Sequence, residues 1–413
     1  MTEAVERFLR YVAVDTESEE GKEEFPSTKK QLVLADMLAG ELAEMGAQDV
    51  RRDEKGYVYA KIPSNLPEGS EAKKLGFVAH MDTAPALTGA NVKPQIWENY
   101  DGGDICLNKE LDIWIRTRKF PELAGYKGQT LITTDGTTLL GADDKAGVAE
   151  IMTMARELLS NPLRKHGTIC IAFTPDEEVG RGADFFDVKG FGADVAYTVD
   201  GGRLGELEYE NFNAASAKVC VHGASIHPGS AKGKMKNALL IAMELQSLLP
   251  AFENPMYTEG YEGFFHLDSM SGGVELAYMD YIIRDHDSAK FERKKELFTQ
   301  AVDFLNKKYG EGTIELKLTD SYRNMREMIE PHMYLIDLAK ASMEKLGIVP
   351  VIKPIRGGTD GARLSYMGLP CPNLCTGGHS AHGKYEYISV QSMEAITGLL
   401  LELAEAFGRL KIS

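Results

Sequence analysis

Three apolar segments that each run directly into acidic residues constrain the fold of this chain more than any other feature. They are Leu75–Ala79, Thr168–Thr174 and Asp194–Val199, and residues carrying a carboxylate follow each of them within a few positions. Uninterrupted apolar strands of this kind are typical of a mainly parallel sheet that is buried on both faces. Helical patterns alternate with these segments. The sequence therefore predicts an α/β domain with a mixed, mainly parallel sheet flanked by helices.

The alternation of apolar strands with helices that is typical of an α/β domain ends near Asn211 and resumes after about Tyr322. Between these points the predicted order is strand, helix, strand, strand, helix, strand, which is that of a split βαβ sandwich. A chain of 413 residues is long enough for two domains. We predict an α/β domain formed by residues 1–211 and 322–413, and an inserted α+β domain formed by residues 212–321.

Composition excludes several classes of partner. The net charge of −16 argues against nucleic acid, which a basic face would have to bind. No apolar run approaches the ~20 residues of a membrane span, and the N-terminal residues carry charges where a signal peptide needs an apolar core. The five cysteines are scattered and odd in number, as is usual for reduced thiols. We expect a cytoplasmic protein with no nucleic-acid or membrane partner.

A loop flanked by glycine, Leu139–Gly147, contains Asp143 and Asp144 and directly precedes a helical pattern. The small residues on either side let the backbone turn sharply and let a ligand approach closely. An Asp that caps the helix would explain the pair equally well. Because carboxylates and histidines recur at the ends of the predicted strands, we interpret the loop as part of a metal site with one Asp as its central ligand.

Acidic and histidine side chains at the strand ends supply the other candidates. His80 and Asp82 are two residues apart, so they point to the same face, and an Asp can orient an imidazole that binds metal. In the pair Glu177 and Glu178, one carboxylate can bind a cation while the other remains a free base. Asp200 follows the third strand. Each of these residues, taken singly, is also explained as an ordinary loop residue.

Two histidines near the C-terminus, His379 and His382, are further candidates, and spacing alone does not choose between them. The carboxyl ends of strands in an open α/β sheet line one edge, where ligands bind. Five or six nitrogen and oxygen donors exceed what one tetrahedral zinc ion uses, and they suit two zinc ions bridged by a carboxylate. Asp143 is the natural bridge. The absence of thiols from this set leaves manganese and cobalt open as substitutes.

These motifs strongly resemble the di-zinc metallopeptidase family that includes aminoacylases, glutamate carboxypeptidases and bacterial dipeptidases. The resemblance implies a catalytic α/β domain and a smaller lid, which agrees with the insertion. The matching stretches follow one another along nearly the whole chain: His80–Thr83, Thr134–Gly147, Phe173–Gly180, Tyr197–Gly202, Glu210–Ala215, His227–Gly229, Tyr281–Asp285, Pro354–Gly361 and Gly377–Gly383.

The resemblance also implies roles for individual residues. It implies two zinc ions per subunit with five protein ligands: His80, Asp143, Glu178, Asp200 and His382. It implies that His80 and Asp200 bind one ion and that Glu178 and His382 bind the other. Asp143 bridges the two ions. His382 is chosen over His379 because the family's ligand directly precedes the glycine of the last motif. Asp82 orients His80, and Glu177 is the general base.

Four residues, three of them in the inserted domain, resemble substrate-binding positions of the family: His227, Asn237, Arg284 and Arg356. His227 matches a histidine that steadies the oxyanion, although a turn histidine before Pro228 is the alternative. Arg356 has independent support, because a guanidinium beside open glycine backbone suits a peptide carboxylate.

The implied activity is hydrolysis of the N-terminal residue from short peptides, tripeptides above all, by a metal-activated water with Glu177 as general base. Two alternatives keep the same two-metal chemistry: a dipeptidase and an N-acyl amino acid deacylase. A peptide-binding protein without activity is the alternative from another class. The expected partners are short peptides, and the chain is compatible with a monomer or a homodimer.

Overall fold

The structure is a computed structural model that describes residues 2–70 and 72–410, and it divides into two compact units. The first unit comprises Met1–Tyr209, Glu327–Lys353 and Thr359–Ser413, and the second comprises Glu210–Arg326 and Pro354–Gly358. Residues 354–358, which the sequence pattern assigns to the α/β domain, thus group with the second unit. The reason is local pairing, since the Ile355 N–H donates to the Glu210 carbonyl at 2.8 Å.

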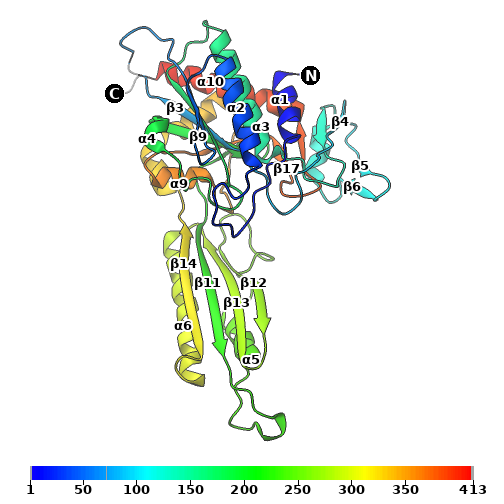
Figure 1. Ribbon diagram of the computed structural model, residues 1–413, viewed down its shortest axis with the longest axis vertical. Helices are drawn as coiled ribbons and strands as arrows, with labels where there is room; N and C mark the ends of the chain where they lie inside the picture. Colours follow the sequence, from blue (N-terminus) through cyan, green and yellow to red (C-terminus); the bar gives the residue numbers. More distant parts are fainter. Residues whose placement is uncertain (1, 71, 411–413) are drawn as a thin grey trace. The chain divides into compact units, whose positions relative to one another are not determined.

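An eight-stranded sheet forms the centre of the first unit (Figure 1). Its strands lie in the order β1-β2-β8-β3-β9-β16-β10-β15. The central strands β8, β3, β9 and β16 run parallel, whereas β2 runs antiparallel to β1 and β8, and β10 runs antiparallel to β16 and parallel to β15, which confirms the predicted mixed sheet. The bounds are β1 Gln48–Arg52, β2 Val58–Ile62, β3 Leu75–His80, β8 Ile169–Thr174, β9 Val195–Gly201, β10 Glu206–Glu208, β15 Val351–Ile352 and β16 Asn373–Cys375.

Helices cover both faces of this sheet, so the central strands are buried throughout. Side chains alternate along β3: Val78 packs in a cluster with Phe191, whereas Phe77 stacks on Tyr197, which in turn contacts Phe407. The Val78 face is covered by α4 and α9, and the Phe77 face by α3, on which α1 and α10 pack. The bounds are α1 Glu3–Val12, α2 Gln31–Glu44, α3 Ala142–Ser160, α4 Val188–Phe191, α7 Arg326–Ile329, η3 Glu330–His332, α8 Tyr334–Lys345, α9 Asp360–Tyr366 and α10 Val390–Arg409.

Two smaller sheets pack around a hydrophobic cluster that includes Tyr100, Leu123 and Tyr387. The segment 85–128 contributes three strands and a 3-10 helix to this region. These elements have three to six residues each, too short to produce a clear periodic pattern. The bounds are β4 Gln95–Trp97, β5 Ile105–Asn108, β6 Ile113–Ile115, η1 Pro121–Tyr126, β7 Leu131–Thr133, β17 Gly378–His379 and β18 Tyr387–Ser389.

The second unit is a four-stranded antiparallel sheet in the order β12-β13-β11-β14, with α5 and α6 packed on one face (Figure 1). The elements follow one another in the predicted split βαβ order. Along β11, Val219 and Val221 face the helices, whereas Cys220 and His222 lie on the other face. The bounds are β11 Asn213–His222, η2 Pro228–Ser230, α5 Ala238–Leu248, β12 Phe264–Gly272, β13 Leu276–Asp285, α6 Ser288–Tyr309 and β14 Ile314–Tyr322.

The pair Pro26-Ser27 predicts a helix start in the sequence, but helix α2 begins at Gln31. The backbone N–H of Ser27 donates to the buried carboxylate of Asp176 at 2.6 Å, and the Gln31 side-chain amide donates to the same carboxylate at 2.6 Å. These bonds tie Ser27 and Gln31 to the loop after β8. Among the helices of residues 2–70 and 72–410, none combines the length and apolarity that crossing a membrane requires.

Candidate metal centre

The carboxyl ends of four parallel strands bring the predicted ligands to one edge of the sheet. His80 is the last residue of β3, Glu178 follows β8, Asp200 lies near the end of β9, and His382 follows β16 and the short strand β17. Asp143 enters from the start of α3. These five residues form two groups, His80, Asp143 and Asp200, and Asp143, Glu178 and His382, whose ligand atoms lie within 4.8 Å of one another. Asp143 is the residue that the two groups share.

In the first group His80 is buried, and Asp143 and Asp200 are partly buried. The His80 Nε2 lies 3.0 Å from Asp143 Oδ1 and 3.4 Å from Asp200 Oδ1. The His80 Nδ1 lies 3.0 Å from the backbone carbonyl of Asp82. An Nδ1–H that donates to this carbonyl leaves the lone pair of Nε2 directed at the two carboxylates, which is the tautomer that a metal ligand needs.

The second group lies on the other oxygen of Asp143. The His382 Nε2 is 3.0 Å from Asp143 Oδ2 and 2.8 Å from Glu178 Oε2. The side chain of His382 is half exposed, whereas that of Glu178 is 4% exposed. Each carboxylate oxygen of Asp143 therefore faces one histidine, which is the geometry expected of a bridging ligand between two cations.

Asp144 has a different role from its neighbour. Its carboxylate accepts the backbone N–H of His80 at 3.1 Å and that of Gly147 at 3.3 Å. It is completely buried and is absent from both groups of candidate ligands. The backbone at Asp143 and Asp144 departs from helical angles, and the peptide bond between them is cis. Asp144 thus holds the start of α3 against the end of β3.

Asp82 contacts the centre mainly through the loop after β8. Its carboxylate accepts the backbone N–H of Glu177 at 3.0 Å and that of Glu178 at 3.1 Å. The His80 ring nitrogen is closer to the Asp82 backbone carbonyl than to this carboxylate, which lies 3.5 Å away. Glu177 belongs to neither group of candidate ligands among the described residues. Its carboxylate therefore remains available for proton transfer.

Two acidic residues that are not among the predicted site residues also support the centre. Glu386 accepts the backbone N–H groups of Leu140, Gly141 and Asp143 at 2.7–3.0 Å. Asp360 accepts the hydroxyl of Thr174 at 2.8 Å, and burial raises its pKa to about 7. In the sequence, Glu386 stands between two tyrosines, and Asp360 stands in a glycine-flanked turn. These local features are the signals by which the two residues could have been found.

The charges of the centre are poorly balanced without cations. Burial and then the charge of Asp143 raise the pKa of Glu178 to about 7, and burial raises that of Asp200 to about 6. Burial and the charge of Asp200 raise the pKa of Glu177 well above its usual value. Burial would lower the pKa of His80, but the surrounding carboxylates raise it well above its usual value. Such mutual repulsion among carboxylates is relieved by bound cations.

The donor set fits divalent metal ions. It consists of imidazole nitrogens and carboxylate oxygens, the ligands that zinc, manganese and cobalt accept. In addition, Glu178 Oε1 is buried and has no hydrogen-bond partner among the described residues. A buried carboxylate oxygen without a partner is costly, and a cation would satisfy it.

His379 points away from this centre. Its ring stacks on Tyr387 with a centroid distance of 4.6 Å, and its Nε2 lies 2.5 Å from the hydroxyl of Tyr126. Burial, followed by the charges of Arg203 and Lys353, lowers the pKa of His379 to about 4. His379 is therefore a neutral residue of an aromatic cluster.

The four predicted substrate-binding residues all lie in the second unit. His227 is exposed. Asn237 caps α5 by accepting two backbone N–H groups. Arg284 donates to two backbone carbonyls of its own sheet. Arg356 donates to the carbonyls of Thr258, Gly260 and Glu262, so its guanidinium already holds a loop of the second unit.

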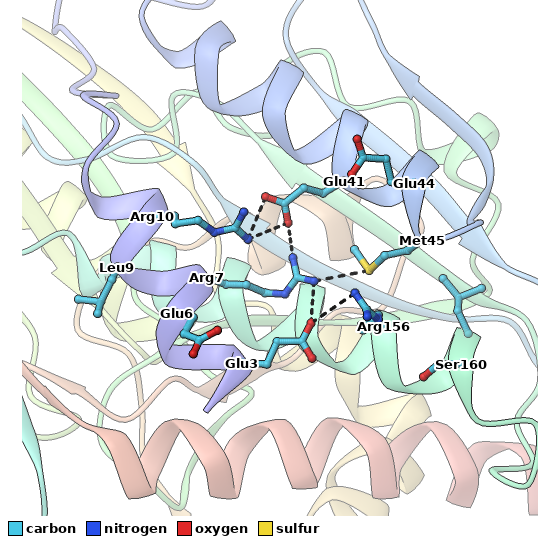
Figure 2. A pocket seen from close by; sticks show the side chains of 11 residues that line it. Glu3, Glu6, Arg7, Leu9, Arg10, Glu41, Glu44, Met45, Arg156 and Ser160 are labelled. Atoms are coloured by element: carbon cyan, nitrogen blue, oxygen red, sulfur yellow. Dashed lines mark hydrogen bonds and ion pairs between the residues drawn. The ribbon is translucent and has the colours of Figure 1, made fainter. Parts of the chain in front are cut away.

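A pocket of about 1000 Å³ lies elsewhere in the first unit, between α1, α2 and α3 (Figure 2). Its arginines pair with acidic neighbours: Arg7 pairs with both Glu3 and Glu41, and Arg10 pairs with Glu41 at 3.2 Å. The pocket shares no lining residue with the candidate metal centre. Its paired charges indicate a structural role.

Comparison with known proteins places these residues in a family. A relative from Alkaliphilus oremlandii named "Peptidase T" is 58% identical over 409 residues, which cover 99% of this chain and 100% of the relative. Aminopeptidase PepT from Bacillus cereus has a similar structure, with a TM-score of 0.78 and 23% identity over 98% of both chains. A tripeptidase from Staphylococcus aureus gives a TM-score of 0.79 at 22% identity, covering 99% and 98% of the two chains.

A family model also matches most of the chain. The model described as peptidase family M20/M25/M40 matches residues 133–406, a range that includes Asp143, Glu177, Glu178, Asp200 and His382. Together with the full-length similarity to peptidases T, this match identifies the family. The chain is therefore a member of peptidase family M20/M25/M40.

Proposed function

We propose that this protein is a metal-dependent exopeptidase that removes the N-terminal residue from short peptides, tripeptides above all. The observation that carries the proposal is the position of Asp143 between two histidines, with one oxygen 3.0 Å from each imidazole. Relatives named "Peptidase T", "aminopeptidase PepT" and "tripeptidase" support the class of substrate.

We assign the five clustered residues to two zinc ions. His80 and Asp200 would hold one ion, Glu178 and His382 the other, and Asp143 both. The sulfur-free donor set supports this assignment and also accommodates manganese or cobalt. When bound, the two cations would polarise the scissile carbonyl and lower the pKa of the attacking water.

Glu177 is the proposed general base. It follows a buried strand, its backbone is held by Asp82, and its carboxylate belongs to neither ligand group. Glu177 would take the proton from the attacking water and return it to the leaving amine. The same carboxylate would thus act first as general base and then as general acid. Asp82 would keep the loop of Glu177 and Glu178 in place.

His227 is proposed to steady the oxyanion of the substrate. It is exposed, and its Nδ1 accepts the backbone N–H of Gly229 at 3.2 Å. This bond leaves Nε2 as the ring nitrogen that can donate to an oxyanion.

The proposed reaction takes place in the cytoplasm, since the five cysteines are free thiols, which suits a reducing compartment.

A panel of substrates tests this function. The purified protein is offered di-, tri- and tetrapeptides and N-acyl amino acids, with and without a metal chelator. We expect chelator-sensitive release of the N-terminal residue, fastest from tripeptides. Preferred cleavage of dipeptides or N-acyl amino acids would overturn the assigned substrate, and chelator-resistant cleavage would overturn the assigned chemistry.

A further inference from the structure

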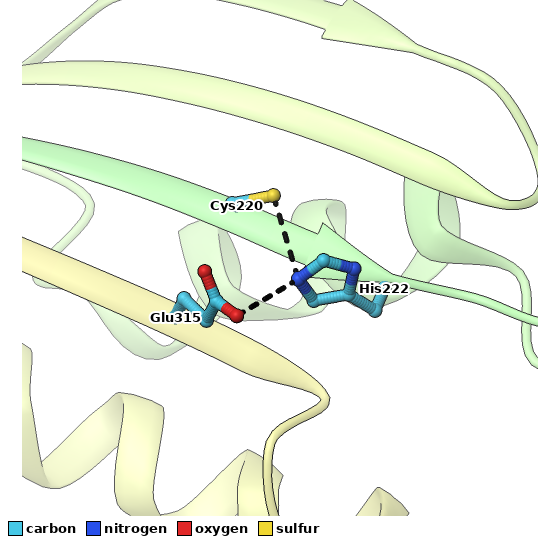
Figure 3. A group of neighbouring side chains, drawn as sticks. All are labelled: Cys220, His222 and Glu315. Atoms are coloured by element: carbon cyan, nitrogen blue, oxygen red, sulfur yellow. Dashed lines mark hydrogen bonds and ion pairs between the residues drawn. The ribbon is translucent and has the colours of Figure 1, made fainter.

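Three side chains on the second unit form a separate cluster of metal-binding groups, Cys220, His222 and Glu315 (Figure 3). Cys220 and His222 lie two residues apart on β11, so both point to the face of the sheet that α5 and α6 leave uncovered. Glu315 is the register partner of Cys220 on the neighbouring strand β14. The hydrogen bonds of the sheet thus fix the relative positions of all three residues.

One ring nitrogen of His222 faces both of the other side chains (Figure 3). Its Nε2 is 3.7 Å from the sulfur of Cys220 and 3.3 Å from a carboxylate oxygen of Glu315. A tetrahedral zinc ion with Zn–S of about 2.3 Å and Zn–N and Zn–O of about 2.0–2.1 Å separates its ligand atoms by about 3.3–3.6 Å. The Nε2–oxygen distance of 3.3 Å lies in this range, and the Nε2–sulfur distance of 3.7 Å exceeds it by 0.1 Å, so a small rotation of the side chains would place the three groups at corners of a zinc tetrahedron.

We propose that Cys220, His222 and Glu315 form a second metal site that binds one zinc or cobalt ion through sulfur, nitrogen and oxygen. Three protein ligands leave the fourth position to water. His222 and Glu315 are exposed and Cys220 is half-buried, so an ion can reach the site from solvent. The ion would join the end of β11 to the start of β14.

The chemistry of the three groups supports a cation. A bound zinc ion would replace the thiol proton and neutralise both the thiolate and the carboxylate. The alternative is an ion pair between a protonated His222 and Glu315 that binds no metal.

The sulfur ligand makes this site distinguishable from the candidate metal centre of the first unit, whose grouped ligands carry only nitrogen and oxygen. The test uses the full chain, stripped of metal, reduced with a phosphine and titrated with cobalt(II). Cobalt bound to a thiolate gives a charge-transfer absorption band in the near ultraviolet, which nitrogen and oxygen ligands do not produce. We expect this band in the wild-type protein, with an intensity that corresponds to one cobalt–thiolate bond per chain.

Substitutions identify the side chains that bind the cobalt ion and give rise to this absorption band. Cys220→Ser should abolish it, and His222→Gln and Glu315→Gln should each raise the cobalt Kd at least tenfold. Cys106→Ser is the matched control, since Cys106 is also partly exposed but belongs to none of the metal-binding groups, and it should keep the band. Peptidase activity with cobalt should remain within twofold in every variant, which shows that each is folded. The proposal is overturned if the active wild-type protein shows no band at excess cobalt, or if the band survives Cys220→Ser.

Discussion

Asp82 holds the backbone of Glu177: its carboxylate accepts the Glu177 N–H at 3.0 Å and, through its other oxygen, the Glu178 N–H at 3.1 Å. Asp82 is completely buried, and its backbone carbonyl lies 3.0 Å from Nδ1 of His80. One residue therefore positions the proposed base and contacts two of the proposed ligands. This arrangement explains how a residue that binds no metal itself can control the centre.

Replacing Asp82 with Asn should disturb this support, because a side-chain amide has one acceptor oxygen and presents N–H groups to the second backbone N–H. We expect kcat/KM to fall by about 10–100-fold, the usual cost of losing a residue that orients metal ligands. Steady-state kinetics and elemental analysis measure the effect. Asp36→Asn, at an exposed ion pair with Arg52, is the control and should stay within twofold. Equal kinetics in the two variants would contradict the supporting role of Asp82.

Glu177→Gln should separate proton transfer from metal binding. The amide cannot act as a base, so kcat should fall by about 10²–10⁴-fold, the range for general acid–base catalysis. The metal content should equal that of the wild type, because Glu177 is in neither ligand group. Turnover of a tripeptide and elemental analysis of dialysed protein check both expectations. A variant within tenfold of wild-type kcat would rule out Glu177 as the base.

Asp143 and Asp200 should differ in their effect on metal content. Asp143 contacts both histidines, whereas Asp200 belongs to the group of His80 alone. Asp143→Asn should therefore weaken the binding of both ions, and Asp200→Asn should weaken mainly one. Elemental analysis at increasing chelator strength measures the two stoichiometries. If the two variants lose the same amount of metal, Asp143 is not a bridge.

Gly147 should tolerate no side chain. A Cβ atom there would lie 2.0 Å from the backbone carbonyl oxygen of Val199 and 2.5 Å from Asp144 Oδ1. Gly147→Ala should lower the free energy of unfolding by about 1–3 kcal/mol or more, the usual cost of overpacking. Gly40→Ala is the matched control, because a Cβ on this α2 residue meets no atom within 4 Å. That control should gain about 0.5–1 kcal/mol from helix propensity. Denaturant unfolding of both variants measures the difference, and equal stabilities would refute the close packing at Gly147.

His379 should make the protein sensitive to acid. Its folded pKa of about 4 lies below the usual value of 6.5, so the unfolded chain takes up the proton first as the pH falls. The stability from the neutral ring is complete above pH 6.5 and is lost progressively toward pH 4, by about 3 kcal/mol in all. His379→Gln should remove this dependence, so its stability relative to the wild type should rise on acidification. Unfolding of both chains without metal, at pH 7 and pH 4.5, checks this. A constant difference between the chains would contradict it.

The sequence by itself determined the strands that carry the centre and most of its ligands. The apolar runs before His80, Glu177 and Asp200 specify buried strands, because their hydrophobicity is a local property that burial must satisfy. Parallel strands then require their ends to meet at one edge. The family resemblance supplied the pairing of ligands, and the distances around Asp143 match that pairing.

The tertiary structure alone decided which distant residues support that edge. Glu386 lies 243 positions from Asp143 in the chain, yet it accepts the Asp143 N–H. Asp82 holds a loop 95 positions away, and Cys220 meets Glu315 only because β11 and β14 are neighbours. Contacts of this kind depend on the order of strands and on the packing of separate segments, which no local pattern of residues encodes.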